Sequence, residues 1–148
     1  MNDPVTANIN ASMQKTSEWL ASVGDELHDE NRQAAYHALR SVMHTLRDRL
    51  TPEEASHLAA GLPAFLRGIY YEGWSPANKP EKLDRQQFLD CVQANYSGPG
   101  ALDPLRCTKA VFAVLQDRIG SGEISDVRST LPRAIEELWP QPNPFVGQ

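Results

Sequence analysis

The fold is decided by a stretch of sequence that occurs twice: residues 42–50 read VMHTLRDRL, and residues 111–119 read VFAVLQDRI. At this offset of 69 positions, residues 16–70 align with residues 85–139 without a gap. Random pairing at average residue usage would give about three identities over this length. The alignment has ten of them: Leu20/Leu89, Val23/Val92, Val42/Val111, Leu46/Leu115, Asp48/Asp117, Arg49/Arg118, Glu54/Glu123, Ser56/Ser125, Leu62/Leu131 and Pro63/Pro132. The sequence therefore predicts a duplicated unit.

The similar pairs extend this pattern, because apolar residues of different size recur at matching places. They are Trp19/Phe88, Leu27/Tyr96, Met43/Phe112, Leu50/Ile119, Ala55/Ile124, Leu58/Val127, Leu66/Ile135, Ile69/Leu138 and Tyr70/Trp139. The feature that recurs is thus the set of positions expected to face a core.

The apolar residues of each unit repeat at a helical interval. Ala35, Leu39, Val42, Leu46 and Leu50 follow a spacing of 4, 3, 4 and 4, which places them on one face of a helix. Almost no stretch alternates with a period of two, so the sequence predicts no strand.

Helix-capping residues, together with glycine and proline residues that interrupt helices, indicate where the helices begin and end. Residues 51–54, Thr-Pro-Glu-Glu, form a capping pattern, and a similar pattern covers residues 84–87. We predict helices over 35–50, from 52 to Gly61, from Pro63 to Gly73, over 85–96 and over 104–119. A break at 120–122 and a last short helix from Pro132 follow.

These elements, with the helices that the alignment at an offset of 69 adds over 16–27 and 121–130, predict an all-α fold of two tandem pseudo-symmetric four-helix repeats, packed as one compact helical bundle with no sheet. The expected parts are a flexible N-terminus (1–11), the first repeat (12–73), a linker (74–84), the second repeat (85–139) and a Pro-rich tail (140–148). Helices this short cannot bury their own apolar faces, so they must pack on one another. The apolar run at residues 111–115 predicts a central place for helix 104–119.

Length and charge exclude several classes. The chain has 148 residues and a formal net charge of −5. It has no apolar run near 18 residues, so we expect no membrane span. The first ten residues lack a basic cluster and an apolar segment, so we expect no secretory signal and a cytoplasmic protein. The acidic balance argues against nucleic-acid binding.

The histidines do not form a metal pattern. His37 and His44 are seven residues apart, which separates them by about 10.5 Å along a helix, too far for direct ligation of one ion. His28 and His57 fall near helix ends. We expect solvated or cap-bonded histidines and no metal site.

Neither the two cysteines nor any known catalytic motif points to an enzymatic reaction. Two cysteines cannot build a disulfide framework or a four-thiolate zinc site. Cys91 and Cys107 are expected to be buried reduced thiols, although their helices are neighbours in sequence and a disulfide stays open. The sequence contains no GxGxxG, Walker A or GxSxG motif. We therefore predict no catalytic residue and no cofactor.

A partly cationic stripe is one candidate for partner binding. His37, Arg40, His44 and Arg47 follow a 3-4-3 spacing on the helix over 35–50. This stripe could meet an acidic partner or a phosphate group. The alternative interpretation is an ordinary solvated helix face.

An aromatic cluster is the other candidate. Tyr70, Tyr71 and Trp74 lie close together in the sequence, with Arg67 one helical turn earlier. Aromatic residues beside an arginine are typical of protein-binding hot spots. The alternative is that these rings close the seam between the two units.

An ordered set of motifs resembles a known family. The motifs are Leu62-Pro63-x-x-Leu66-Arg67, Tyr70-x-x-Gly73-Trp74, Phe88-Leu89-x-x-Val92, the run 111–115, Ile119-x-x-Gly122-Glu123 and Leu131-Pro132. Over about residues 15–139 the chain resembles the bacterial "domain of unknown function 2267" family. The resemblance implies an all-helical cytosolic bacterial protein built from this duplicated unit. It implies no reaction, cofactor or catalytic residue.

Two functions are left by these observations. The first is an interaction or structural module that binds a protein partner or itself through a helical groove or the aromatic cluster. The second is a small-molecule-binding protein or an enzyme, which would need a closed apolar cavity of roughly 300 Å³ or more between the two units.

Overall fold

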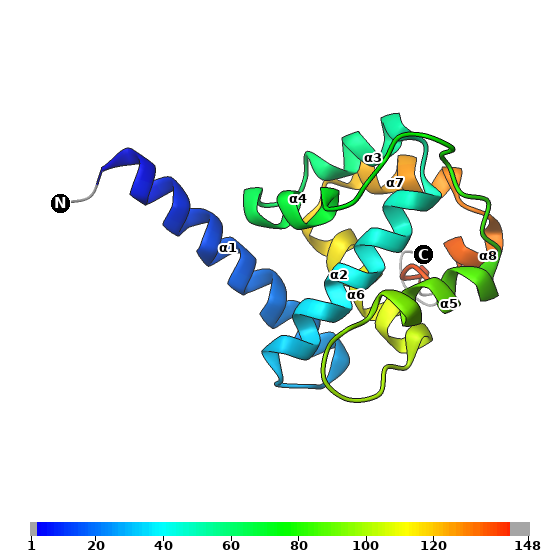
Figure 1. Ribbon diagram of the computed structural model, residues 1–148, viewed down its shortest axis with the longest axis horizontal. Coiled ribbons are helices and arrows are strands. Elements are labelled where there is room, and N and C mark those ends of the chain that lie inside the picture. Colours follow the sequence, from blue (N-terminus) through cyan, green and yellow to red (C-terminus); the bar gives the residue numbers. More distant parts are fainter. Residues whose placement is uncertain (1–2, 143–148) are drawn as a thin grey trace.

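The computed structural model describes residues 3–142, which form eight helices and no strand (Figure 1). The all-α prediction is confirmed. The helices are α1 (Pro4–Leu27), α2 (Arg32–Arg49), α3 (Pro52–Ala59), α4 (Ala64–Tyr71), α5 (Arg85–Asn95), α6 (Pro104–Arg118), α7 (Ser121–Thr130) and α8 (Arg133–Glu136).

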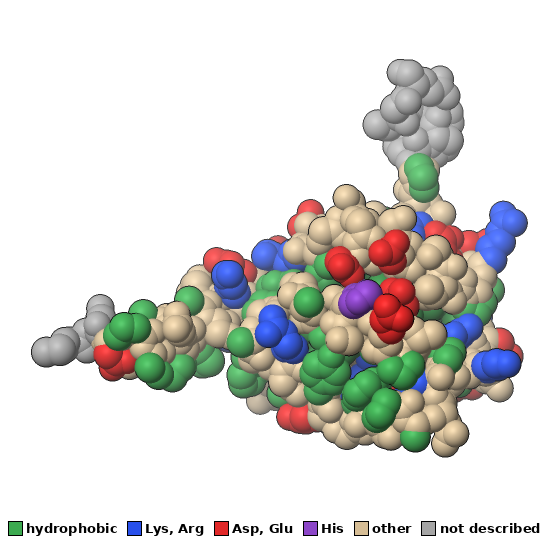
Figure 2. All heavy atoms as spheres, turned by 90° about the horizontal axis from the view of Figure 1, so that it is seen from above, with side chains coloured by type: hydrophobic (Ala, Val, Ile, Leu, Met, Phe, Trp, Pro, Cys, Tyr) green, Lys and Arg blue, Asp and Glu red, His purple; other side chains and the backbone are tan. Residues whose placement is uncertain are grey.

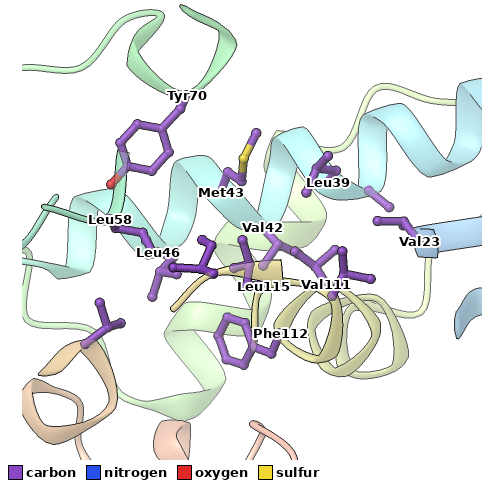
Figure 3. Packing of buried hydrophobic residues seen from close by; sticks show 14 of the residues in the cluster. Val23, Leu39, Val42, Met43, Leu46, Leu58, Tyr70, Val111, Phe112 and Leu115 are labelled. Carbon is purple, nitrogen blue, oxygen red and sulfur yellow. The ribbon is translucent and has the colours of Figure 1, made fainter. Parts of the chain in front are cut away.

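Helices α2 and α6 lie at the centre of the core. Val42 and Leu46 of α2 meet Val111 and Leu115 of α6, and all four side chains are fully buried (Figure 3). Helix α6 also packs against α1, α5 and α7. This is the enclosed position that its apolar run predicts.

The N-terminal and C-terminal sets of four helices interlock in one core. Helix α1 packs against α6, α5 packs against α2, and α3 packs against α7. The buried residues form a single cluster that draws on both sets. No helix among residues 3–142 is long and apolar enough to cross a membrane.

Side-chain caps begin the helices where the sequence predicts them. At the start of α5, the Asp84 carboxylate accepts a hydrogen bond from the backbone N–H of Gln87 at 2.8 Å. The side-chain oxygen of Gln87 in turn accepts from the backbone N–H of Asp84 at 2.9 Å. At α3 the Thr51 hydroxyl accepts from the Glu54 amide at 3.2 Å. The return bond from Glu54 does not form there, since its buried Oε2 has no partner in the described residues.

The start of the chain differs from the prediction. The sequence predicts a flexible segment over 1–11, whereas α1 already begins at Pro4. Asp3 caps this helix by accepting from the Thr6 amide at 2.7 Å, and Pro4 occupies the first turn, where its missing N–H costs nothing. The outer part of α1 projects from the body (Figure 1). Of the predicted Pro-rich tail, residues 143–148 lie outside the described residues.

The predicted linker, residues 74–84, contains no helix. It passes the C-terminal end of α2, where the backbone amide of Glu81 donates to the carbonyl group of Asp48 at 2.8 Å. Lys79 lies 3.9 Å from the Asp48 carboxylate and 3.3 Å from that of Glu81. The connection between α4 and α5 is therefore held to the body.

Candidate functional site

Two residues of the predicted cationic stripe are buried and bind the end of α4. Arg47 has 5% of its surface exposed and donates from Nη1 to the carbonyl groups of Tyr70 and, at 2.6 Å, Glu72. Nε2 of His44, which is 6% exposed, donates to the carbonyl group of Ile69 at 2.7 Å. The last carbonyl groups of a helix have no partner within it. His44 and Arg47 supply those partners for α4.

Burial also sets the protonation of His44. Loss of solvent lowers the pKa of its imidazole below the ordinary value of 6.5, and the charges of Arg47 and Arg40 lower it further. The bond to Ile69 acts in the opposite direction. The imidazole is therefore held in its neutral form.

Tyr70 belongs to the core. Its side chain is fully buried, and its hydroxyl group donates to the carbonyl group of Ala55 at 2.7 Å. Burial raises the pKa of this phenol. Tyr71 contacts Tyr70 edge-on at 5.2 Å between ring centres, and Trp74 contacts Tyr71 at 5.5 Å. Tyr71 and Trp74 are half-buried and pack against the core cluster.

Of the other predicted residues, Arg40 also reaches the end of α4, whereas Arg67 and His37 make contacts elsewhere. Arg67 is exposed and donates to the carbonyl groups of Ala59 at 3.1 Å and Leu62 at 3.0 Å. Arg40 lies 3.9 Å from Glu72. His37 lies instead beside the loop after α5, with its ring 6.3 Å from that of Tyr96. The eight candidates thus form no single exposed patch.

Neither cysteine has a lowered pKa that would activate its thiol. Both are free, and burial raises the pKa of Cys107 to about 12. Burial and nearby carboxylates also raise the pKa of Cys91. A thiol with a raised pKa is a poor nucleophile. Residues 3–142 contain no group of three His, Cys, Asp or Glu side chains that could hold a metal ion.

The most exposed apolar side chains lie on the projecting part of α1, residues 4–14, which we call the arm. Val5, Ile9 and Met13 are 67%, 57% and 56% exposed. Their spacing of four residues places them on one side of the helix. Figure 2 shows hydrophobic side chains gathered on the projecting end.

The apolar side of the arm leads into a pocket of about 340 Å³, which we call the arm pocket. Its walls come from α1, α2 and α4, and they are Met13, Thr16, Leu20, Arg32, Gln33, Tyr36 and Phe65. Phe65 is 45% exposed at its edge. The pocket therefore opens to solvent and does not lie between the two sets of four helices.

Two polar contacts fix the walls of the arm pocket. The amide of Phe65 donates to Ser12 Oγ at 3.1 Å and joins the start of α4 to α1. Arg32 donates from Nη2 to Ser17 Oγ at 2.8 Å and joins the start of α2 to α1. These contacts hold the three helices at the positions that leave the pocket open.

A signal for this surface is present in the sequence. Val5, Ile9 and Met13 follow a helical interval in a stretch, residues 4–14, that carries no charged side chain. The prediction of a flexible N-terminus did not take this helical interval into account.

The chain is thus an all-α protein whose described residues include an exposed apolar helix face beside a pocket. It belongs to the family described as "uncharacterized conserved protein (DUF2267)", whose family model matches residues 16–138. The expected family resemblance is confirmed. The match begins at residue 16, so the arm lies before it. No curated protein matches the chain.

Proposed function

We propose that the protein is a protein-interaction module whose docking surface consists of the arm and the arm pocket. The observation that carries this proposal is the exposure of Val5, Ile9 and Met13 in line with an apolar pocket. Each of these side chains would gain roughly 1 to 2 kcal/mol from burial against a partner. A groove beside a helix, lined by apolar side chains, suits an amphipathic helix of another chain.

The arm pocket also has the volume of a small-molecule site. Its open edge argues against that use, because Phe65 there is 45% exposed and a small-molecule pocket encloses most of its ligand. Two of its polar side chains are also engaged within the protein. Arg32 is engaged by Ser17, and Thr16 donates to the carbonyl group of Ser12 at 2.8 Å. A protein surface is the better-supported occupant.

We further propose that the scaffold of this surface consists of two copies of one four-helix unit. The residues before α4 and α8, Pro63 and Pro132, support this with φ/ψ angles of −56°/150° and −56°/146°. Leu50 and Ile119 end α2 and α6 at −97°/156° and −104°/148°. If the unit is duplicated, the backbone of residues 16–70 should superimpose on that of residues 85–139, and a superposition of the two segments tests this.

Site-specific photo-crosslinking tests the docking function. A benzophenone amino acid would replace Phe65 at the edge of the arm pocket, and in a control protein it would replace Arg133, whose side chain is 91% exposed on α8. Irradiation in cell lysate should join a polypeptide to position 65 and not to position 133. Mass spectrometry would identify that polypeptide. Equal labelling at both positions, or none at position 65, would refute the proposal.

A further inference from the structure

We infer that the occupant of the arm pocket is the arm of a second copy of this chain, so that two copies pair α1 against α1 in antiparallel orientation. This inference rests on the proposed docking function and names its partner. It follows from the spacing, the charge and the extent of the apolar side of α1.

The apolar side of α1 includes both a protruding part, the arm, and a receiving part, its wall of the arm pocket, so one copy can fit against another. Ile9, Met13, Thr16 and Leu20 follow a spacing of 4, 3 and 4, which is that of a seam between two packed helices. The outer residues of this seam protrude, and the inner residues line the arm pocket. A second copy would therefore fill the pocket and cover the arm in one contact.

A two-fold axis near residues 12 and 13 gives this pairing a definite register. Ile9 of one copy then lies opposite Thr16 of the other, and Val5 lies opposite Leu20. Tyr36 and Phe65 of the receiving copy flank the inserted arm, because both line the same pocket. Each copy inserts its own arm and receives the other, as closed two-fold association requires.

The charge distribution permits identical chains to meet at this surface. The whole chain carries a formal charge of −5, yet residues 4–14 contain no charged side chain. The contact therefore brings no like charges together on the arms. Asp3 at the tip of the arm is opposite in sign to Arg32 in the pocket wall. Antiparallel helices also place the positive end of one dipole near the negative end of the other.

The extent of the contact predicts a weak dimer. Residues 4–21 on each copy span about 27 Å of helix. With the pocket walls added, such a contact lies near the lower size of stable protein interfaces, about 1,000 Å². Association should be reversible and should depend on protein concentration over the micromolar range.

Sedimentation velocity of the full chain, from about 1 to about 300 µM, tests the pairing. The sedimentation coefficient should rise with concentration as dimer forms. Ile9→Lys should weaken association at least about tenfold, because it places a charge against the apolar pocket. The matched control is Ala7→Lys, which adds the same charge to an exposed position on the opposite side of the arm and should leave association unchanged.

A disulfide test examines the register. In a Cys91→Ser background, Met13→Cys should form a disulfide-linked dimer under mild oxidation, since position 13 lies beside the proposed two-fold axis. Ala11→Cys, on the opposite side of the arm, should not. A dimer that Ile9→Lys weakens but Met13→Cys fails to link would overturn the antiparallel register.

A chain that stays monomeric at every concentration, or a dimer that Ile9→Lys does not weaken, would overturn the self-pairing. The crosslinking experiment separates this failure from failure of the docking function. A monomeric chain that still captures a different polypeptide at position 65 would retain the docking function and lose the second copy as its occupant.

Discussion

The buried guanidinium group of Arg47 donates to the carbonyl group of Tyr70, which lies 23 residues further along the chain. This contact ties the end of α4 to the central helix α2. Among the C-terminal helices, Gln116 stands 69 positions after Arg47. There Arg128 donates to Gln116 Oε1 at 2.7 Å and to the carbonyl group of Pro140 at 3.0 Å. Arg47 thus holds the end of α4, and Arg128 holds the chain just after α8.

Replacing Arg47 should destabilise the fold. Arg47→Met removes the buried donor and leaves carbonyl groups of Tyr70 and Glu72 unpaired, which should cost about 2–3 kcal/mol of unfolding free energy. Urea denaturation measures this loss. The control is Arg40→Met, because Arg40 only lies 3.9 Å from Glu72 at the surface and should cost less than about 0.5 kcal/mol. Similar losses in both variants would show that the bonds of Arg47 are not important.

The pH dependence of stability should contain a contribution from His44. Its folded-state pKa lies below the ordinary value of 6.5, so the unfolded chain binds this proton more readily than the folded chain does. This contribution is fully present above about pH 6.5 and is lost as the pH falls toward the lowered folded-state pKa. His44→Gln should flatten the decline in unfolding free energy that begins as the pH falls below about 6.5. His57→Gln, at an exposed position on α3, should leave the decline unchanged.

The hydroxyl group of Tyr70 should contribute measurably to the free energy of unfolding. Tyr70→Phe keeps the buried ring but leaves the carbonyl group of Ala55 without its 2.7 Å partner. The unfolding free energy should fall by about 1–1.5 kcal/mol. Thermal or urea unfolding would measure it against Tyr71→Phe, where the ring is half-buried. A larger loss for Tyr71→Phe would contradict the assignment of the buried bond to Tyr70.

The two thiols should react at different rates. Cys107 is fully buried and its pKa is raised to about 12, so a thiol-specific reagent at pH 8 should label it only after unfolding. Cys91 is partly exposed and should react first in the folded protein. Counting modified thiols with and without denaturant checks this order. In Cys91→Ser, the early phase should disappear, and its survival would show that Cys107 is accessible.

The fold could be predicted from the sequence because its signal is repeated. Val42 and Val111, or Leu46 and Leu115, are apolar at positions that the internal sequence alignment pairs, and all four are fully buried. Periodicity reports which face of a helix avoids water, and that is sufficient for an all-α fold.

The burial of His44 and Arg47 could not be predicted in the same way, whereas the helical interval of Val5, Ile9 and Met13 on the arm is present in the sequence. His44 and Arg47 stand outside the leucine stripe of α2, and a helical interval alone indicates a solvated face. The structure instead places α4 over this second face, so α2 is buried on more than one side. Which neighbour covers a polar face depends on tertiary packing, and residue spacing does not encode that choice.

The interlocked arrangement of the helices has a practical consequence. Because α1 lies against α6 and α5 lies against α2, a cut in the connection between α4 and α5 would leave each fragment without half of its apolar surroundings. Neither fragment would have a complete interior, but together they would have one. The chain is therefore a natural starting point for a split reporter, in which reassembly of the two fragments signals that two fused proteins have met.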